Sequence, residues 1–271
     1  MFGKLTKYEF RSYFKSLLPV WCAVLVLALI NGFTLPRGDM VGVDGVNAFL
    51  TFVLPLMLFV ISFVVMGIVT LVQTIERFWR GLLGNEGYLM FTLPVSRSQL
   101  IGSKLLVSVT VQLIGGVVIC LSGVILVLLL GREEFLEVLS QGFGFIAQVF
   151  REYPGESWTA VVIVLEVVVL ALLGMANNSL HLYAAMSLGH LSKKQKVAVS
   201  VLAWVGLNVL FTNLTIRIGA GAANSLPSWL MVEKLADVVP LLFIAILISA
   251  IHDALYWALT ELILKRKLNL E

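Results

Sequence analysis

The chain has 271 residues, of which 59% are hydrophobic and 13% are charged, and its formal net charge is +3. A soluble domain carries about 25% charged residues, because charge has to cover its surface. So little charge excludes a soluble globular protein. The apolar residues instead gather in blocks of about 20, the length of helix that crosses a bilayer.

Six apolar blocks predict an all-α integral membrane protein, because a helix satisfies its own backbone hydrogen bonds in lipid. A membrane barrel needs ten-residue strands of alternating hydrophobicity, and the sequence has none. The predicted transmembrane spans are 16–33, 47–73, 105–130, 158–188, 197–218 and 238–263. Residues 1–271 are therefore interpreted as a single transmembrane domain.

The first fifteen residues predict an amphipathic helix that lies flat in the headgroup region of the membrane. Large apolar side chains share one face of a helix over 1–15, and four cations share the opposite face. The apolar residues are Phe2, Leu5, Phe10, Tyr13 and Phe14, and the cations are Lys4, Lys7, Arg11 and Lys15. The run that follows, 16–33, is too long for a cleaved signal and is interpreted as a retained span.

The distribution of basic residues predicts that both termini lie in the cytoplasm. Cytoplasmic loops of membrane proteins are enriched in Lys and Arg. Most of the 19 basic residues lie in the N-terminal segment, in the loops after the second and fourth spans, and in the C-terminal tail. This predicts a multi-pass protein of a bacterial cytoplasmic membrane. The positive charge serves topology and lipid contact, and nucleic-acid binding is not expected.

Two segments between spans predict ordered structure. Residues 74–104, on the cytoplasmic side, are too polar to span a membrane and too apolar for a plain linker. Within them, Ser96 is the predicted N-cap of a helix that continues through Lys104 into the third span. Residues 131–157 predict an external segment with a helix from Glu133 to Val149.

Three predicted spans carry polar stripes. Ionisable groups within a span are costly in lipid and are therefore candidates for function, whereas Asn, Thr and Ser also form bonds between helices. The candidates for a substrate path are Glu166, Asn177, His181, Asn208, Thr212, Asp253 and Tyr256. For Glu166 and Asp253, a structural role and a place in a substrate path both stay open.

One stretch of sequence resembles a known family. Gly84-Asn85-Glu86-Gly87-Tyr88 is followed by Thr-Leu-Pro-Val-Ser over 92–96 and by Ser-Lys-Leu-Leu over 103–106. It resembles the segment between the second and third spans of permeases of the type-2 ABC exporter family. In that family a Glu-containing coupling helix precedes a Thr-x-Pro-Val-Ser-like turn. The basic N-terminal helix, the six spans and the short Lys-rich loop after the fourth span also match the family's architecture.

The resemblance implies a permease subunit of an ATP-driven exporter, with no catalytic role of its own. It implies that ABC ATPase subunits dock on this chain, and that a second copy or a homologous permease completes the assembly. The docking residues that it implies are Asn85, Glu86, Gly87, Tyr88 and Arg97. The chain has no Gly-x4-Gly-Lys-Ser/Thr phosphate loop, so ATP and Mg²⁺ are expected on the partner ATPase and no cofactor is expected here.

The substrate and the alternatives follow from the same residues. A path lined mostly by aliphatic and aromatic side chains favours an amphipathic or lipophilic substrate, a peptide or a drug-like compound. A secondary carrier is one alternative, although inverted repeats are absent. An intramembrane enzyme is the other: Glu133-Glu134 resembles the paired glutamates of membrane prenyl-protein peptidases, but Val138 stands where those enzymes need Arg. The three histidines show no metal-ligand spacing, so no metal is expected.

Overall fold

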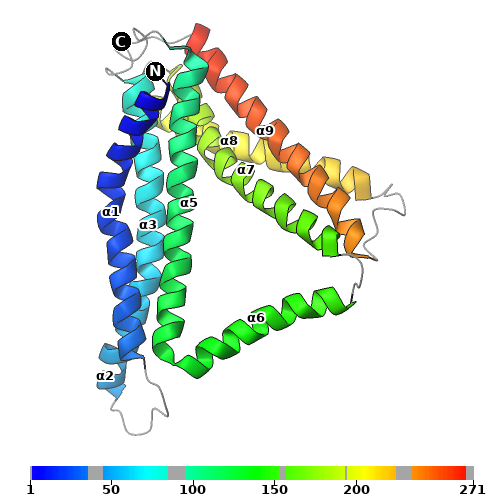
Figure 1. Ribbon diagram of the computed structural model, residues 1–271. Helices are drawn as coiled ribbons and strands as arrows, with labels where there is room; N and C mark the ends of the chain where they lie inside the picture. Colours follow the sequence, from blue (N-terminus) through cyan, green and yellow to red (C-terminus); the bar gives the residue numbers. More distant parts are fainter. Residues whose placement is uncertain are drawn as a thin grey trace. The chain divides into compact units, whose positions relative to one another are not determined.

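The computed structural model describes residues 2–35, 45–84, 95–152, 157–192, 194–223 and 234–266. These residues form helices joined by short turns and include no strand, as the sequence predicts (Figure 1). Six helical stretches are long and apolar enough to cross a membrane, which fits a multi-pass membrane protein. The chain divides into two compact units. One consists of Lys7–Gln73 and Thr110–Arg151, and the other of Met1–Thr6, Thr74–Val109 and Glu152–Glu271.

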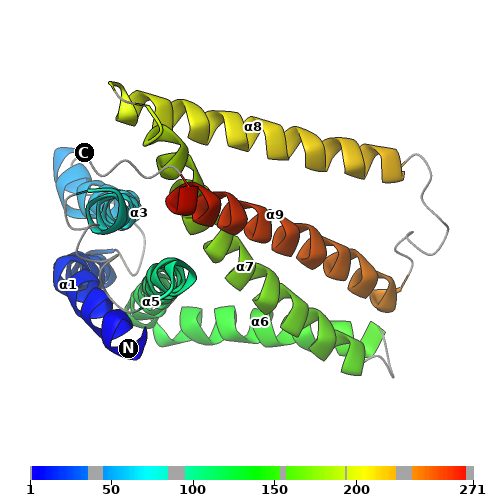
Figure 2. The same ribbon diagram turned by 90° about the horizontal axis from the view of Figure 1, so that it is seen from above.

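The unit formed by Lys7–Gln73 and Thr110–Arg151 contains long helices that run side by side and one, α6 (Arg132–Glu152), that leaves the end of α5 (Arg97–Leu130) at an angle (Figures 1 and 2). It takes in most of α1 (Phe2–Thr34), α2 (Gly45–Ala48), the π-helical turn η1 (Phe49–Val53), most of α3 (Leu54–Phe78), the second part of α5, and α6. The helix predicted within the external segment is thus present as α6, a few residues longer than expected.

One face of α1 supplies the core of this unit. Its buried residues recur every three or four positions, as expected for a helix that packs along a single stripe. They include Tyr13, Leu17, Trp21, Val24 and Ala28. Near the end of α1, the Asn31 Nδ2 donates to the Pro55 carbonyl of α3 at 3.0 Å. The next residue, Gly32, allows α5 to approach closely, because an added Cβ would lie 2.6 Å from the Leu129 Cβ.

Helix α1 runs without a break over 33 residues, from Phe2 to Thr34. At 1.5 Å per residue its length is about 50 Å, compared with ~30 Å for the apolar layer of a bilayer. The structure therefore shows one continuous helix where the sequence predicts an interfacial helix over 1–15 and a separate span over 16–33. Pro19, one turn past the predicted boundary, lies inside α1 without ending it, and no glycine interrupts the helix between Gly3 and Gly32.

The other unit is formed mainly by the C-terminal half of the chain. It contains α7 (Ser157–Gly189), α8 (Lys196–Ala223), the 3₁₀ turn η4 (Leu235–Asp237), α9 (Val238–Arg266), and the adjoining ends of α3 and α5. α7 packs along both α8 and α9. A glycine makes the turn from α7 into α8 compact, since a Cβ on Gly189 would lie 2.6 Å from the Lys196 carbonyl oxygen.

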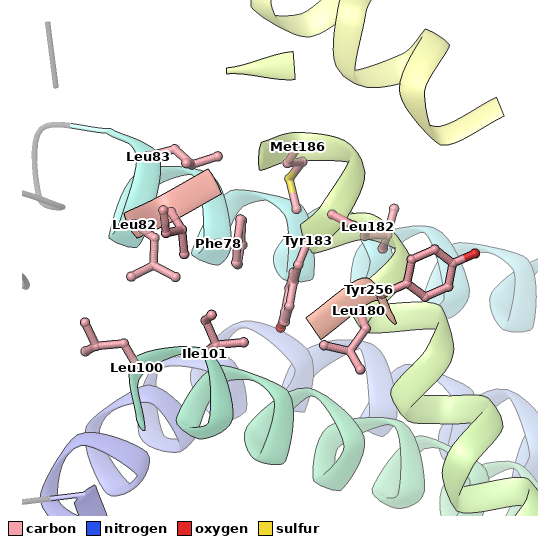
Figure 3. Packing of buried hydrophobic residues seen from close by; sticks show 12 residues of the cluster. Phe78, Leu82, Leu83, Leu100, Ile101, Leu180, Leu182, Tyr183, Met186 and Tyr256 are labelled. Carbon is pink, nitrogen blue, oxygen red and sulfur yellow. The ribbon is translucent and has the colours of Figure 1, made fainter. Parts of the chain in front are cut away.

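The apolar core of this unit lies where the ends of α3, α5, α7 and α9 meet (Figure 3). At its centre, Phe78 and Tyr183 stack with their ring centroids 4.2 Å apart. The chain then widens from α3 into the π-helical turn η2 (Trp79–Leu83), which buries two further leucines. We call this cluster the loop base; it comprises Phe78, Leu82, Leu83, Leu100, Ile101, Leu180, Leu182, Tyr183, Ala184, Met186, Tyr256 and Leu264.

Ser96 caps α5, as the sequence predicts. The Gln99 backbone N–H donates to the Ser96 Oγ at 3.2 Å, and the Ser96 backbone N–H donates to the Gln99 Oε1 at 3.1 Å. This reciprocal pair is a capping box, which satisfies two backbone donors at the start of a helix. α5 begins at Arg97 and continues through Lys104 to Leu130.

The cap leads to a prediction about stability. Replacing Ser96 with Ala removes an acceptor that no neighbouring group supplies, so we expect the free energy of unfolding to fall by about 1 kcal/mol. Replacing it with Asp keeps a capping oxygen and is expected to preserve stability. Thermal unfolding of the purified protein in detergent measures both variants. Equal stability of the Ala and Asp variants would show that the cap contributes nothing.

Candidate functional site

Polar side chains of α7 and α9 meet at Asp253. This residue is only 8% exposed, and its Oδ1 accepts a hydrogen bond from the Asn177 Nδ2 at 2.8 Å. Its second oxygen, Oδ2, is buried and has no hydrogen-bond partner among the described residues. Buried polar atoms are nearly always paired in native proteins. Asp253 therefore keeps an unused acceptor inside a helix that is apolar enough to cross a membrane.

Aromatic rings continue this cluster along the same helices. His181 follows Asn177 by four residues and Tyr256 follows Asp253 by three, so each lies on the same helix face as its polar neighbour. The His181 ring stacks on Tyr256 with centroids 5.1 Å apart, and on Trp204 of α8 with centroids 5.6 Å apart. The His181 Nε2 lies 3.1 Å from the Trp204 carbonyl oxygen, so Nε2 carries the hydrogen that this bond needs.

The structure brings together four of the predicted path residues, which are Asn177, His181, Asp253 and Tyr256. We call these four the polar cluster. Their contacts show that the predicted stripes of α7 and α9 face each other. The carboxylate and amide, placed beside stacked rings, offer both hydrogen bonding and an aromatic surface to a bound group.

The other three predicted path residues lie elsewhere. Asn208 and Thr212 are exposed on α8. Glu166 is half-buried on α7, and its Oε2 is buried without a hydrogen-bond partner among the described residues. Glu166 shares an angular position with Asn177, but the two are separated along the helix by about 16 Å at 1.5 Å per residue.

Residues 85–94 lie outside the described part of the chain, and with them four of the predicted docking residues, Asn85, Glu86, Gly87 and Tyr88. The fifth, Arg97, is the first residue of α5 and is half-buried. Both flanks of this segment are anchored in the loop base. Leu82 and Leu83 enter it from the preceding side, and Leu100 and Ile101 from the following side.

Lys104 ties these two flanks together, a contact that the sequence does not predict. Its side chain is 4% exposed, and its Nζ donates to the Arg77 carbonyl at 3.1 Å, near the end of α3. The last carbonyls of a helix lack partners within it and attract cations. Gly81 leaves room for the ammonium group, since an added Cβ would lie 2.6 Å from Nζ. Only the approach of two helices reveals this contact, so no sequence signal predicts it.

Glu261 of α9 is a second residue that sequence reasoning missed. Its Oε1 accepts a hydrogen bond from the Ser98 Oγ of α5 at 2.8 Å, and its Oε2 accepts one from the Trp257 Nε1 at 3.3 Å. Glu261 thereby fixes the start of α5 to α9, directly beside Arg97. A carboxylate near the end of a predicted span is ordinary in sequence, and only its partners distinguish it.

No family model matches the sequence, and no curated protein or solved structure matches it. Among the described residues, no three His, Cys, Asp or Glu side chains gather as they would to hold a metal ion. We therefore infer the function from the polar cluster and the loop base.

The Asn177–Asp253 contact makes a measurable prediction. In a double-mutant cycle with Asn177→Ala and Asp253→Ala, we expect a coupling free energy of about 1 kcal/mol, typical of a hydrogen bond between membrane helices. Replacing the exposed Asn208 with Ala in the same cycle is the matched control, and its effect should add to that of Asp253→Ala. Unfolding of the purified protein in mixed micelles gives the free energies. Additive effects of Asn177→Ala and Asp253→Ala would show that the bond does not form.

Proposed function

We propose that the chain is the membrane-spanning permease subunit of an ATP-driven exporter of the type-2 ABC family. The observation that supports this most is the loop base. The segment that resembles the family's coupling helix is held at both flanks by one apolar core, and Lys104 joins the flanks to each other. A segment whose two described flanks are fixed in this way suits a docking point that has to pass force into the membrane helices.

The loop base also connects the segment to the polar cluster. Tyr183 belongs to the loop base and lies on α7 two residues after His181, while Tyr256 belongs to both features. Packed side chains transmit displacement because protein interiors are close-packed. A movement of the docked segment would therefore reach the Asn177–Asp253 pair, about 9 Å along α7 from Tyr183 at 1.5 Å per residue.

The partners follow from this proposal. ABC ATPase subunits would bind ATP and Mg²⁺ and dock on Asn85 to Tyr88 and on Arg97. A second copy or a homologous permease would complete the path. The first half of α7 exposes large apolar residues, among them Val164, Leu165 and Val168. Such a surface suits lipid or a second permease, and the substrate would be an amphipathic or lipophilic molecule such as a peptide or a drug-like compound.

One observation favours a second function. The free Oδ2 of Asp253 is a buried acceptor in a membrane helix, and carriers driven by ion gradients use intramembrane carboxylates of this kind. A secondary carrier would use Asp253 to bind the coupling ion and would need no ATPase. The two functions differ in the partner that they require.

The test is co-purification of the full chain expressed together with the genes that neighbour its own gene. We expect an ATPase to elute with the chain in a fixed ratio. Glu86→Ala and Tyr88→Ala should each lower the bound ATPase several-fold, because an aromatic anchor and a charged group commonly dominate such interfaces. Glu137→Ala, which removes a carboxylate from α6, is the matched control and should leave the complex intact.

Two outcomes would contradict the proposal. An ATPase that elutes equally well with the Glu86 and Tyr88 variants would remove the docking assignment. The absence of any ATPase, combined with transport driven by an ion gradient in liposomes and abolished by Asp253→Asn, would establish the carrier instead.

The proposed orientation places both termini in the cytoplasm and α6 outside a bacterial cytoplasmic membrane. In a background with Cys22→Ser and Cys120→Ser, we expect Gln141→Cys to react with an impermeant maleimide added to intact cells. Lys194→Cys should react only after permeabilisation, because positively charged loops stay inside. The reverse labelling pattern would invert the proposed topology.

A further inference from the structure

Helix α6 has two faces of opposite character and leaves its apolar face uncovered. Leu136, Leu139 and Phe143 follow i, i+3, i+7 spacing and are 50%, 38% and 67% exposed. Glu137 and Gln141 lie on the opposite face, where the Gln141 Nε2 donates to the Glu137 Oε1 at 3.2 Å. The polar face thus carries a hydrogen bond of its own, whereas large apolar side chains remain exposed on the other face.

The connections of α6 place both of its ends at one membrane surface. α5 ends at Leu130 and α6 begins at Arg132, after which α7 begins at Ser157. α5 and α7 are each long enough to cross a membrane, so as consecutive spans they face α6 with ends on the same side. In its own unit, α6 leaves the end of α5 at a steep angle (Figure 1).

The length of α6 and of the connection after it favour a helix that lies along the membrane. The 21 residues of α6 measure about 32 Å at 1.5 Å per residue. The chain between Glu152 and Ser157 reaches less than ~20 Å even when fully extended. An upright α6 would therefore pull the first turns of α7 out of the bilayer and expose apolar side chains such as Val161 and Val164 to water, a cost that a helix along the surface avoids. Trp158 is 75% exposed at the start of α7, and Trp is enriched at the interface between membrane and water.

We propose that α6 is an interfacial helix whose partner is the lipid surface itself, with Leu136, Leu139 and Phe143 inserted among the acyl chains. Lipid is the partner that we expect for the apolar face of α6, because the helix is connected at both ends to membrane spans. The polar face, with Glu137 and Gln141, points to water. This contact needs neither the exporter function nor the proposed orientation, since it depends only on the spans.

The net charge of α6 indicates which force holds this helix at the lipid surface. Its sequence holds four Glu and two Arg, so it carries an excess of acid. Anionic headgroups would repel such a helix, in contrast to the basic interfacial helices that they attract. Burial of the apolar face is therefore the driving force, and the contact is expected to be insensitive to anionic lipid content.

The experiment uses the full chain in liposomes of neutral phosphatidylcholine, in a background with Cys22→Ser and Cys120→Ser. Spin labels are attached to Phe143→Cys on the apolar face and to Gln141→Cys on the polar face as the matched control. Collisions with oxygen, which concentrates in acyl chains, are compared with collisions with a water-soluble nickel complex. We expect the ratio of oxygen to nickel collisions to be several-fold higher at position 143 than at 141.

Three results would overturn the proposal. Equal ratios at the two positions would place the apolar face in water, and exclusion of both reagents from position 143 would place it against protein. A ratio at 143 that rises several-fold when phosphatidylglycerol is added would show that headgroup charge, not apolar burial, holds the helix. Leu136→Cys on the same face replaces Phe143→Cys if that variant does not elute as folded protein.

Discussion

The stacking of Phe78 on Tyr183 is the contact around which the loop base is organised. It joins the end of α3 to α7, and through Tyr256 the same cluster reaches α9. Close-packed aromatic groups resist small displacements, so the helix ends that meet here act together. Lys104 adds a charged bond from α5 to the last turn of α3. The docking and substrate-path roles proposed for this unit both depend on the loop base.

The polar cluster is joined to the loop base through Tyr256, which belongs to both. An Asp side chain without partners in a membrane helix costs free energy. Asp253 instead accepts a hydrogen bond from Asn177 through one oxygen, and it lies one helical turn from Tyr256 of the loop base. Under the proposed function, its position would allow a change at the proposed docking segment to alter the surroundings of the free oxygen. Coupling of this kind requires two arrangements of the same helices, each favoured by a different bound partner.

Much of the fold could be predicted because the bilayer leaves helix as the only sensible form for the long apolar runs. The N-cap at Ser96 and the helix after residue 131 were also predicted, since both depend on local sequence. The contacts that were missed depend on distant neighbours. The bond from Lys104 to the Arg77 carbonyl arises only when two helices meet. α1 continues past residue 15 with Pro19 inside it, which an amphipathic pattern does not reveal.

The bond from Asn31 to Pro55 bears on how the chain enters the membrane during synthesis. An amide in the first hydrophobic helix resists transfer into lipid, and the bond from its Nδ2 to the Pro55 carbonyl lowers that cost once α3 is alongside, while its Oδ1 stays buried without a partner among the described residues. The ribosome supplies α3 shortly after α1, so the two helices can leave the translocation channel as a hairpin rather than one at a time. On that route the polar group never faces lipid alone, and the first two spans form a pair before the rest of the protein exists.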